Sequence, residues 1–174
     1  KKNGAYGVRD PAVISQLVEL VTKEGKSPKT EFVGKSAKYI LDKIGITVGD
    51  DVKVILMEAK EDHPFVQVEL MMPILPLVRV PDVDQAIEMA VRVEHGNRHT
   101  AMMHSRNVEK LTKMAKLIQT TIFVKNGPSY AGIGVGGEGY TTFTIAGPTG
   151  EGLTSAKSFA RRRRCVLVGG MDVR

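Results

Sequence analysis

A regular alternation of strand-like and helix-like segments between residues 74 and 125 constrains the fold of this chain more than any other feature. Asp82 and Gln85 have the spacing of a capping box, which marks the start of the first helix. The alternating segments are strands at 74–80, 100–104 and 122–125, and helices from Asp82 and over 107–119. Because short links between alternating strands and helices favour parallel strands with right-handed crossovers, the pattern predicts an α/β fold on a parallel sheet.

The N-terminal half predicts two further helices and a strand. The first helix spans 11–23, with Asp10 as its cap and apolar residues on one face. A polar loop at 24–33 separates it from a second helix at 36–44, which Ser36 would cap and Gly45 would end. These helices are followed by a buried-type strand at 52–57.

The character of the chain changes after Asn126. Half of its eighteen glycines lie between residues 127 and 152, where one β-like stretch, Tyr140–Ile145, interrupts them. Residues 154–168 then predict one long strand of irregular pattern. A glycine-rich region before such a strand is typical of an arm that packs on another surface. We therefore expect two parts, an α/β part at 1–139 and a glycine-rich loop with a terminal strand at 140–174.

Composition excludes several classes of protein. With 42% hydrophobic and 25% charged residues the chain is neither disordered nor a fibrous rod. No apolar run approaches the roughly 18 residues that suggest a membrane helix. The single cysteine excludes an internal disulfide and a cysteine-rich metal site, so we expect an intracellular protein.

The formal charge of +6 depends strongly on one run of four arginines, Arg161 to Arg164, without which it would be +2. A basic run can indicate an anionic partner. Alternation along a strand would place two arginines on each face, and no aromatic residues are interleaved with them. A solvated or inter-subunit strand is therefore favoured over a nucleic-acid patch.

Two glycine motifs match phosphate-binding patterns only in part. Residues 132–137, Gly-Ile-Gly-Val-Gly-Gly, have the spacing of a dinucleotide fingerprint. That fingerprint requires a strand before the glycines and a helix after them, whereas β-like residues follow here. We interpret the segment as a flexible loop lining a site. Gly34-Lys35-Ser36 lacks the preceding glycine of a phosphate-binding loop, because Lys29 stands there, and is interpreted as a helix cap.

Cysteine and histidine provide one weak catalytic candidate. Cys165 lies in the predicted terminal strand with no histidine near it in sequence, which indicates a buried structural role. The histidines are His63, His95, His99 and His104, and no pair of them has zinc-site spacing, so no metal site is predicted. His99 follows a loop and begins a strand, a place where catalytic groups are found.

Several segments carry a resemblance to a known family. They are a Glu-X-X-X-Pro stretch within 63–78, residues 96–107 (Gly-Asn-Arg-His-Thr-Ala-Met-Met-His-Ser-Arg-Asn), and residues 122–128, 136–144 and 148–156. These segments resemble the aldehyde dehydrogenase superfamily, and in particular its CoA-acylating acetaldehyde and propionaldehyde dehydrogenases of ethanolamine and propanediol utilisation. The resemblance begins at about residue 30 and continues to the C-terminus.

The resemblance implies a three-layer α/β catalytic domain on a parallel sheet, followed by a C-terminal strand through which homo-oligomers form. It implies the reaction of a short-chain aldehyde, coenzyme A (CoA) and NAD to acyl-CoA and NADH, through a thioester on a cysteine. In such enzymes that cysteine lies upstream of the Glu-X-X-X-Pro stretch, and no cysteine precedes Cys165 here. We therefore expect the later part of the catalytic domain, inactive by itself and without its nucleotide-binding domain.

Two site residues follow from the resemblance. Glu69 matches the glutamate that hydrogen-bonds the ribose hydroxyls on the nicotinamide side of NAD. His99 matches a histidine near the nucleophile, which could accept a proton from CoA or from the cysteine thiol. Pro73 matches the turn after the glutamate. Met71 departs from the aromatic residue of non-acylating relatives, and Ser129 stands where some close relatives have cysteine.

Two alternatives remain open. The chain could be a stand-alone basic α/β module that binds anions or nucleic acid, or a module that acts only in assembly through its terminal strand. The enzyme interpretation implies no nucleic-acid or membrane partner and a cytoplasmic location, with housing in a bacterial microcompartment left open.

Overall fold

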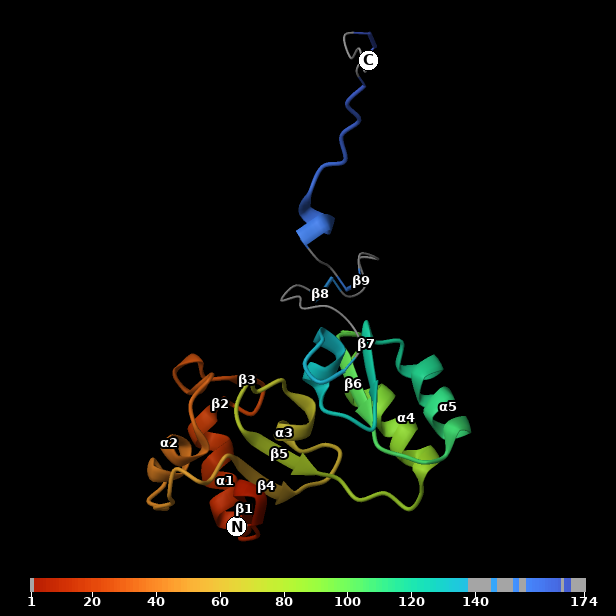
Figure 1. The fold of residues 1–174 in the computed structure, drawn as a ribbon. Coiled ribbons are helices and arrows are strands. Elements are labelled where there is room, and N and C mark those ends of the chain that lie inside the picture. Colours follow the sequence, from red (N-terminus) through yellow and green to blue (C-terminus); the bar gives the residue numbers. More distant parts are fainter. Residues whose placement is uncertain (1, 138–144, 147–151, 154–155, 167, 170–174) are drawn as a thin grey trace. The chain divides into compact units, whose positions relative to one another are not determined.

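The computed structural model describes residues 2–137, 145–146, 152–153, 156–166 and 168–169, and the chain divides into two compact units, Lys1–Val93 and Glu94–Arg174 (Figure 1). The predicted boundary at residue 139, and all of the β-like stretch Tyr140–Ile145 except its last residue, lie outside the described residues.

A three-stranded parallel sheet forms the centre of the first unit. Its strands are β1 (Ala5–Val8), β4 (Val54–Glu58) and β5 (Ile74–Leu77), in the order β1-β4-β5. On one side Ile55 of β4 is opposite Tyr6, and on the other side it is opposite Ile74. The predicted strands at 52–57 and 74–80 are confirmed with shifted ends, whereas β1 has too short an apolar run to be predicted.

Local side-chain caps begin the helices of this unit. Asp10 accepts a hydrogen bond from the amide of Ala12 at 2.9 Å and begins α1 (Pro11–Val21). Ser36 accepts from the amide of Tyr39 at 3.2 Å and begins α2 (Ala37–Asp42).

The predicted capping residue of the fourth helix, α4 (Val83–Val93), is also confirmed, because Asp82 accepts from the amide of Gln85 at 2.9 Å. The predicted helices at 11–23 and 36–44 are thus confirmed together with their caps. The first helix ends at Val21, two residues before its predicted end, and Thr22–Lys23 form a short strand, β2. The segment predicted as a polar loop, 24–33, contains its antiparallel partner, β3 (Ser27–Pro28), and a 3-10 turn at Thr30–Phe32. A 3-10 turn at Lys2–Gly4 precedes β1, and a one-turn helix, α3 (Pro64–Gln67), lies between β4 and β5.

Apolar residues of the sheet, α1 and α2 form one core. Leu17 of α1, Ile40 and Leu41 of α2, and Ile55 of β4 have no exposed surface. The other buried members of this core are Val8, Val21, Phe32, Ala37, Val48, Val52, Met57, Phe65, Leu70 and Ile74. Phe65 and Leu70 extend the core into the link between β4 and β5, so that link is held by burial.

The second unit contains a separate two-stranded parallel sheet. Strands β6 (Thr100–Met103) and β7 (Ile122–Lys125) are joined through α5 (Val108–Ile118), which Asn107 caps. The buried residues of α5 and β7 are Leu111, Met114, Ile118, Ile122 and Val124. The predicted strands at 100–104 and 122–125 and the helix at 107–119 are therefore confirmed.

The strand and helix series is divided between the two units. We expected a parallel sheet running through the strands at 74, 100 and 122, yet β5 pairs with β4 and β6 pairs with β7. The alternation of elements predicts their type and their parallel direction, but it does not determine which strands are neighbours. Neighbours are decided by the hydrogen bonds of the ladder, which sequence periodicity does not encode.

The C-terminal region differs from the predicted long strand. Its described parts are a short antiparallel pair, β8 (Ile145–Ala146) with β9 (Gly152–Leu153), and a 3-10 turn, Ala156–Phe159. Residues 160–166 contain no helix or strand and are exposed. A strand requires a partner for its backbone groups, and the described residues of this chain provide none for 160–166.

Removal of side-chain volume at the centre of β4 should destabilise the first unit strongly. Ile55→Ala leaves a cavity at a fully buried site, so we expect a loss of about 2–5 kcal/mol in the free energy of unfolding. Urea unfolding followed by circular dichroism measures it. Leu75→Ala on the neighbouring strand is the control, because Leu75 is half exposed and should cost less than half as much. Equal losses would contradict the assigned core.

Candidate functional site

The link between β4 and β5 carries Glu69, the first predicted site residue. Glu69 is exposed, lies between α3 and β5, and has no hydrogen bond or ion pair to another described residue. Its neighbour Leu70 is buried and holds the backbone at this point. An exposed carboxylate on an anchored backbone is free to accept hydrogen bonds from two hydroxyl groups of a ligand.

Three contacts order the segment that precedes Glu69. The Nδ1 atom of His63 accepts a hydrogen bond from the amide of Phe65 at 3.1 Å and so caps α3. The side-chain amide of Gln67 donates to the carbonyl oxygen of Glu61 at 2.5 Å. The carboxylate of Glu61 receives two hydrogen bonds from Arg92 of α4, at 2.8 and 3.0 Å.

The pKa values of two residues in this segment are lowered, for different reasons. The hydrogen bond from Arg92 lowers the pKa of Glu61, so this ion pair persists over the whole neutral range. Burial lowers the pKa of His63, against the smaller and opposite effect of Asp62. The acceptor role of Nδ1 also requires a neutral ring with its proton on Nε2. His63 is therefore neutral at pH 7.

The turn after Glu69 has an unusual backbone. Met71 has a φ of 54°, in the left-handed region, and its side chain is 57% exposed. The Met71 carbonyl accepts a hydrogen bond from the amide of Gly34 at 3.1 Å, which fixes the turn to the loop before α2. Pro73 follows and accepts from the amide of Ile55, as expected of a structural residue. A non-glycine residue with positive φ costs about 1–2 kcal/mol, which the surrounding contacts must offset.

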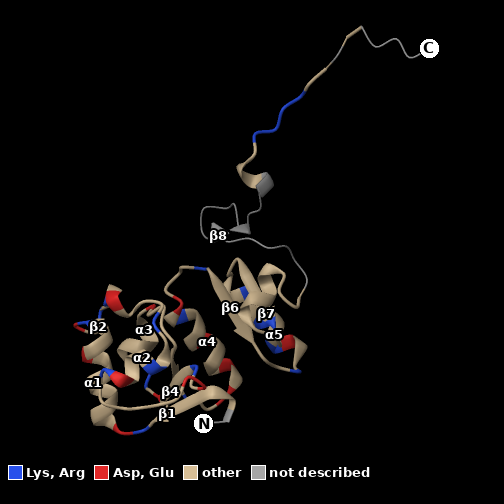
Figure 2. Cartoon of the chain, turned by 60° about the vertical axis from the view of Figure 1, so that its left-hand side comes forward, with Lys and Arg blue, Asp and Glu red and all other residues tan. Residues whose placement is uncertain are grey.

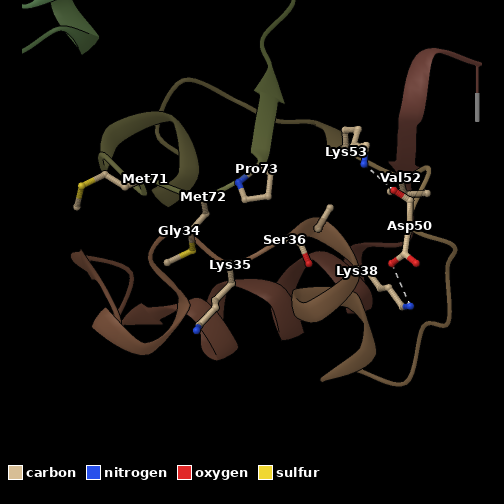
Figure 3. Close-up of a pocket in the computed structure, with 11 residues that line it drawn as sticks. Gly34, Lys35, Ser36, Lys38, Asp50, Val52, Lys53, Met71, Met72 and Pro73 are labelled. Carbon is tan, nitrogen blue, oxygen red and sulfur yellow. Dashed lines mark hydrogen bonds and ion pairs between the residues drawn. The ribbon is translucent and has the colours of Figure 1, made fainter. Parts of the chain in front are cut away.

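A cavity of about 520 Å³ lies beside this turn (Figure 3). Lys38 forms an ion pair with Asp50 at 3.2 Å, and Lys53 donates to the Asp50 carbonyl oxygen. In Figure 3 the Met71 side chain extends to the side opposite Lys38 and Asp50. Ser36 lines the cavity and uses its hydroxyl to cap α2, which confirms the helix-cap interpretation of Gly34-Lys35-Ser36.

His99, the second predicted site residue, lies in the other unit, directly before β6. It is exposed, and its carbonyl accepts a hydrogen bond from the amide of Ile122 at 3.1 Å, which places it at the amino end of the two-stranded sheet. The Nδ1 atom lies 2.7 Å from the hydroxyl of Thr100. This hydrogen bond orients the ring and leaves Nε2 as the nitrogen available to a ligand. Because Glu69 and His99 belong to different units, the structure assigns each its own local geometry.

Asn126 is a residue that the sequence reasoning did not single out. Its side chain accepts from the amide of Ser105 at 2.8 Å and donates to the Ser105 carbonyl at 2.9 Å. It therefore joins the loops that follow β6 and β7, at the carboxyl edge where parallel sheets commonly bind ligands. Its φ is 56°, a conformation that asparagine tolerates better than most residues. The dipeptide Asn126-Gly127 before a proline was the available signal, since it marks a turn.

The glycine motif at 132–137 begins inside a 3-10 helix, Ser129–Ile133, and not at the end of a strand. This agrees with the rejection of the dinucleotide fingerprint. Gly132 packs against β7, where an added Cβ would overlap the Cγ2 atom of Ile122. Gly134 ends the 3-10 helix with a φ of 90°. These two glycines have fixed structural roles, in contrast to the flexible loop that we expected.

The arginine run lies in an exposed segment without helix or strand (Figure 2). Cys165, which follows it, is exposed, so the prediction of a buried structural thiol is wrong for the chain by itself. Burial was inferred from a strand that this segment does not form within one chain.

The described part of the chain was searched for metal-binding clusters and for membrane-spanning helices. No three histidine, cysteine, aspartate or glutamate side chains gather there in a way that could hold a metal ion. None of its helices combines the length and the apolar character needed to span a membrane.

Substitution of Asn126 should separate conformational strain from lost hydrogen bonds. Asn126→Gly removes both bonds to Ser105 and keeps the positive φ, which should cost about 1–3 kcal/mol. Asn126→Ala loses the same bonds and adds left-handed strain, so it should be less stable than the glycine variant by about 1 kcal/mol. Thermal unfolding of both variants measures the difference. An alanine variant as stable as the glycine variant would contradict the assigned backbone conformation.

Comparison with known proteins shows which family this chain resembles. Residues 52–150 match the model of the aldehyde dehydrogenase family. The chain is 52% identical over 165 residues to a propanal dehydrogenase (CoA-propanoylating) of Salmonella typhimurium, covering 94% of this chain and 35% of the relative. The chain thus spans about a third of the length of the curated relatives that it matches.

Solved structures of propionaldehyde dehydrogenases also match this chain. A propionaldehyde dehydrogenase of Rhodopseudomonas palustris, with bound CoA and an acylated cysteine, matches with a TM-score of 0.89 and 71% identity over 95% of this chain and 38% of its own. A propionaldehyde dehydrogenase from the fucose utilisation microcompartment of Clostridium phytofermentans matches with a TM-score of 0.86 and 49% identity, over 96% and 38%. The family match, the identities and the parallel α/β units agree with the resemblance in sequence, and this chain belongs to the aldehyde dehydrogenase family.

Proposed function

We propose that this chain is part of a CoA-acylating aldehyde dehydrogenase, which converts a short-chain aldehyde, CoA and NAD⁺ to acyl-CoA, NADH and a proton. The observation that carries the proposal is the 71% identity, over 95% of the chain, to a propionaldehyde dehydrogenase with bound CoA and an acylated cysteine. No cysteine precedes Cys165, so the nucleophile is assigned to a part of the enzyme outside this chain. The comparisons give no support to a stand-alone nucleic-acid-binding module.

In this proposal Glu69 binds the cofactor. An exposed carboxylate without a partner among the described residues fits the task of accepting hydrogen bonds from two vicinal ribose hydroxyls. When bound, the nicotinamide accepts the hydride of the substrate. The anchored backbone at Leu70 and the fixed turn at Met71 would hold the carboxylate in place.

His99 is proposed as the group that exchanges a proton near the acyl-transfer step. Its ring is oriented by Thr100, and Nε2 faces away from that contact. An imidazole can accept a proton from a thiol near neutral pH and return it later. The proton of the CoA thiol would pass to Nε2 as the CoA sulfur attacks the carbonyl carbon of the cysteine thioester. The bond from that carbon to the cysteine sulfur would break, and the cysteine would leave as a thiolate.

The C-terminal region is proposed to complete its structure in an oligomer. Residues 160–166 are exposed and unpaired within the described part of the chain, as expected for a strand that pairs with another protomer. A cytoplasmic location is proposed with it. The Clostridium phytofermentans relative comes from a bacterial microcompartment, which supports a location inside a microcompartment for this protein as well.

The first test is turnover by the full-length gene product. It should form NADH from propionaldehyde only when CoA is present, whereas residues 1–174 alone should form none. His99→Gln should lower kcat by about 10²- to 10⁴-fold, because proton transfer is lost. His104→Gln is the control, since His104 is also exposed but lies just beyond the carboxyl end of β6. Full activity of the His99 variant would refute the assigned role, and CoA-independent turnover would refute the reaction.

Loss of the Glu69 carboxylate should weaken cofactor binding more than catalysis. Glu69→Ala should raise the KM for NAD by about 10- to 100-fold, because hydrogen bonds to a charged acceptor are lost. Initial rates at varied NAD concentration measure this. Glu31→Ala removes another exposed carboxylate of the same unit and should leave the KM unchanged. If both variants behave alike, Glu69 is not a cofactor ligand.

A further inference from the structure

His63 caps α3, the one-turn helix that precedes Glu69 in the chain. We propose that His63 is a positioning residue for the cofactor site: its neutral ring holds α3 and thereby Glu69, and protonation of the ring weakens cofactor binding. This inference rests on the cofactor role of Glu69 proposed above.

The helix that His63 caps is short enough to depend on its cap. Helix α3 has a single turn, Pro64–Gln67. Its backbone hydrogen bonds run from the amides of Val66 and Gln67 to the His63 carbonyl, at 2.8 and 3.2 Å, and from the Val68 amide to the Pro64 carbonyl, at 2.9 Å. A single turn gains little from helical hydrogen bonds, so its end contacts decide whether it forms. The bond from the Phe65 amide to His63 Nδ1, at 3.1 Å, is the side-chain contact at its N-terminus, and it adds to the backbone bonds that the His63 carbonyl accepts.

The cap is connected to Glu69 through buried side chains. Phe65, whose amide is the donor, is 4% exposed, and its ring contacts the His63 ring edge-on with centroids 5.2 Å apart. Leu70 is 6% exposed. Glu69 thus projects from a short stretch fixed by burial at Phe65 and Leu70. Loss of the cap would free the turn between these two residues, and with it the direction of the Glu69 side chain.

Protonation removes the acceptor on which the cap depends. An imidazolium carries a hydrogen on Nδ1 and on Nε2, so it cannot accept from the Phe65 amide. The charged groups around the ring are Asp62 beside it in sequence, and Glu58 and Lys60, which line the same cavity of about 570 Å³. From α1 this cavity receives only the uncharged residues Pro11, Ile14 and Ser15.

The direction of the pH effect follows from these surroundings. Burial lowers the pKa of His63 below its ordinary value of 6.5, and Asp62 opposes this effect only in part. The folded segment therefore binds its proton less readily than the unfolded chain does. The cap is complete above pH 6.5 and is lost as the pH falls below that value toward the lowered pKa.

The chain contains a matched cap that does not titrate in this range. Asp10, Pro11 and Ala12 at the start of α1 repeat the arrangement of His63, Pro64 and Phe65: in both, a proline follows the cap and the second amide of the helix donates to the cap side chain. A side-chain oxygen can therefore replace the ring nitrogen as the acceptor in a cap of this kind. His63→Asn should keep the cap at every pH without adding charge beside Asp62, and His63→Ala should remove it.

The experiment measures the Kd of NADH by fluorescence in the full-length enzyme between about pH 5.5 and pH 8. For the unmodified enzyme the affinity should fall below pH 6.5. His63→Asn should bind as the unmodified enzyme does at pH 8 and lose less affinity on acidification. His63→Ala should bind about fivefold more weakly across the range, as expected for a lost cap. Asp10→Ala is the control, since it removes the matched cap and should leave the Kd unchanged.

Two outcomes would overturn the inference. One is an asparagine variant with the same pH dependence as the unmodified enzyme, and the other is an alanine variant that binds NADH normally at pH 8. The variant Glu69→Gln distinguishes failure of this inference from failure of the proposed function. If Glu69→Gln leaves the Kd of NADH unchanged, Glu69 is not a cofactor ligand and the proposed function fails at this residue. If Glu69→Gln weakens binding, the double variant with His63→Ala should bind no more weakly than Glu69→Gln alone, because both changes act through one carboxylate.

Discussion

The first unit depends on the pairing of β4 with a parallel strand on each side. Its backbone is satisfied by β1 and β5, and its residue Ile55 has no exposed surface. A parallel sheet is stable only when apolar layers cover it, and here α1 and α2 contribute the fully buried Leu17, Ile40 and Leu41. The link after β4 starts from this fixed strand and returns to β5, so the position of Glu69 is determined by the same core.

Side-chain caps and positive φ angles, more than long helices, shape the loops of the candidate site. His63 and Ser36 each begin a helix of at most six residues. Met71, after Glu69, and Asn126, after β7, have positive φ angles. Met71 accepts one hydrogen bond from Gly34, and Asn126 forms two with Ser105. Both conformations cost energy. The one at Met71 lies two residues from Glu69, whereas the one at Asn126 lies at the end of the two-stranded sheet opposite to His99.

Local signals in the sequence predicted most of the elements, and non-local pairing explains most of what they missed. Asp10, Ser36 and Asp82 were identified as caps because capping depends on residues within one turn. Strand β1 and the division of the strands into two sheets depend on partners distant in sequence, which periodicity does not report. The error at Cys165 has the same cause. Its burial was inferred from a predicted strand, and the described residues of this chain contain no partner for that strand. Glu69 came from resemblance alone, whereas His99 was also indicated by its place between a loop and a strand.

The close packing of Gly132 on β7 has a consequence for how this segment can vary. Glycine content is commonly equated with freedom of movement, yet at this position the missing side chain acts as a spacer that sets how near the 3-10 helix lies to Ile122. A library of variants that treats all glycines of the segment as equivalent would mix two kinds of site. At Gly136, an added Cβ meets no atom but the positive φ disfavours it. At Gly132 the obstacle is the side chain of Ile122 on the neighbouring strand. A smaller side chain at position 122 could therefore restore the packing that a larger residue at position 132 disrupts.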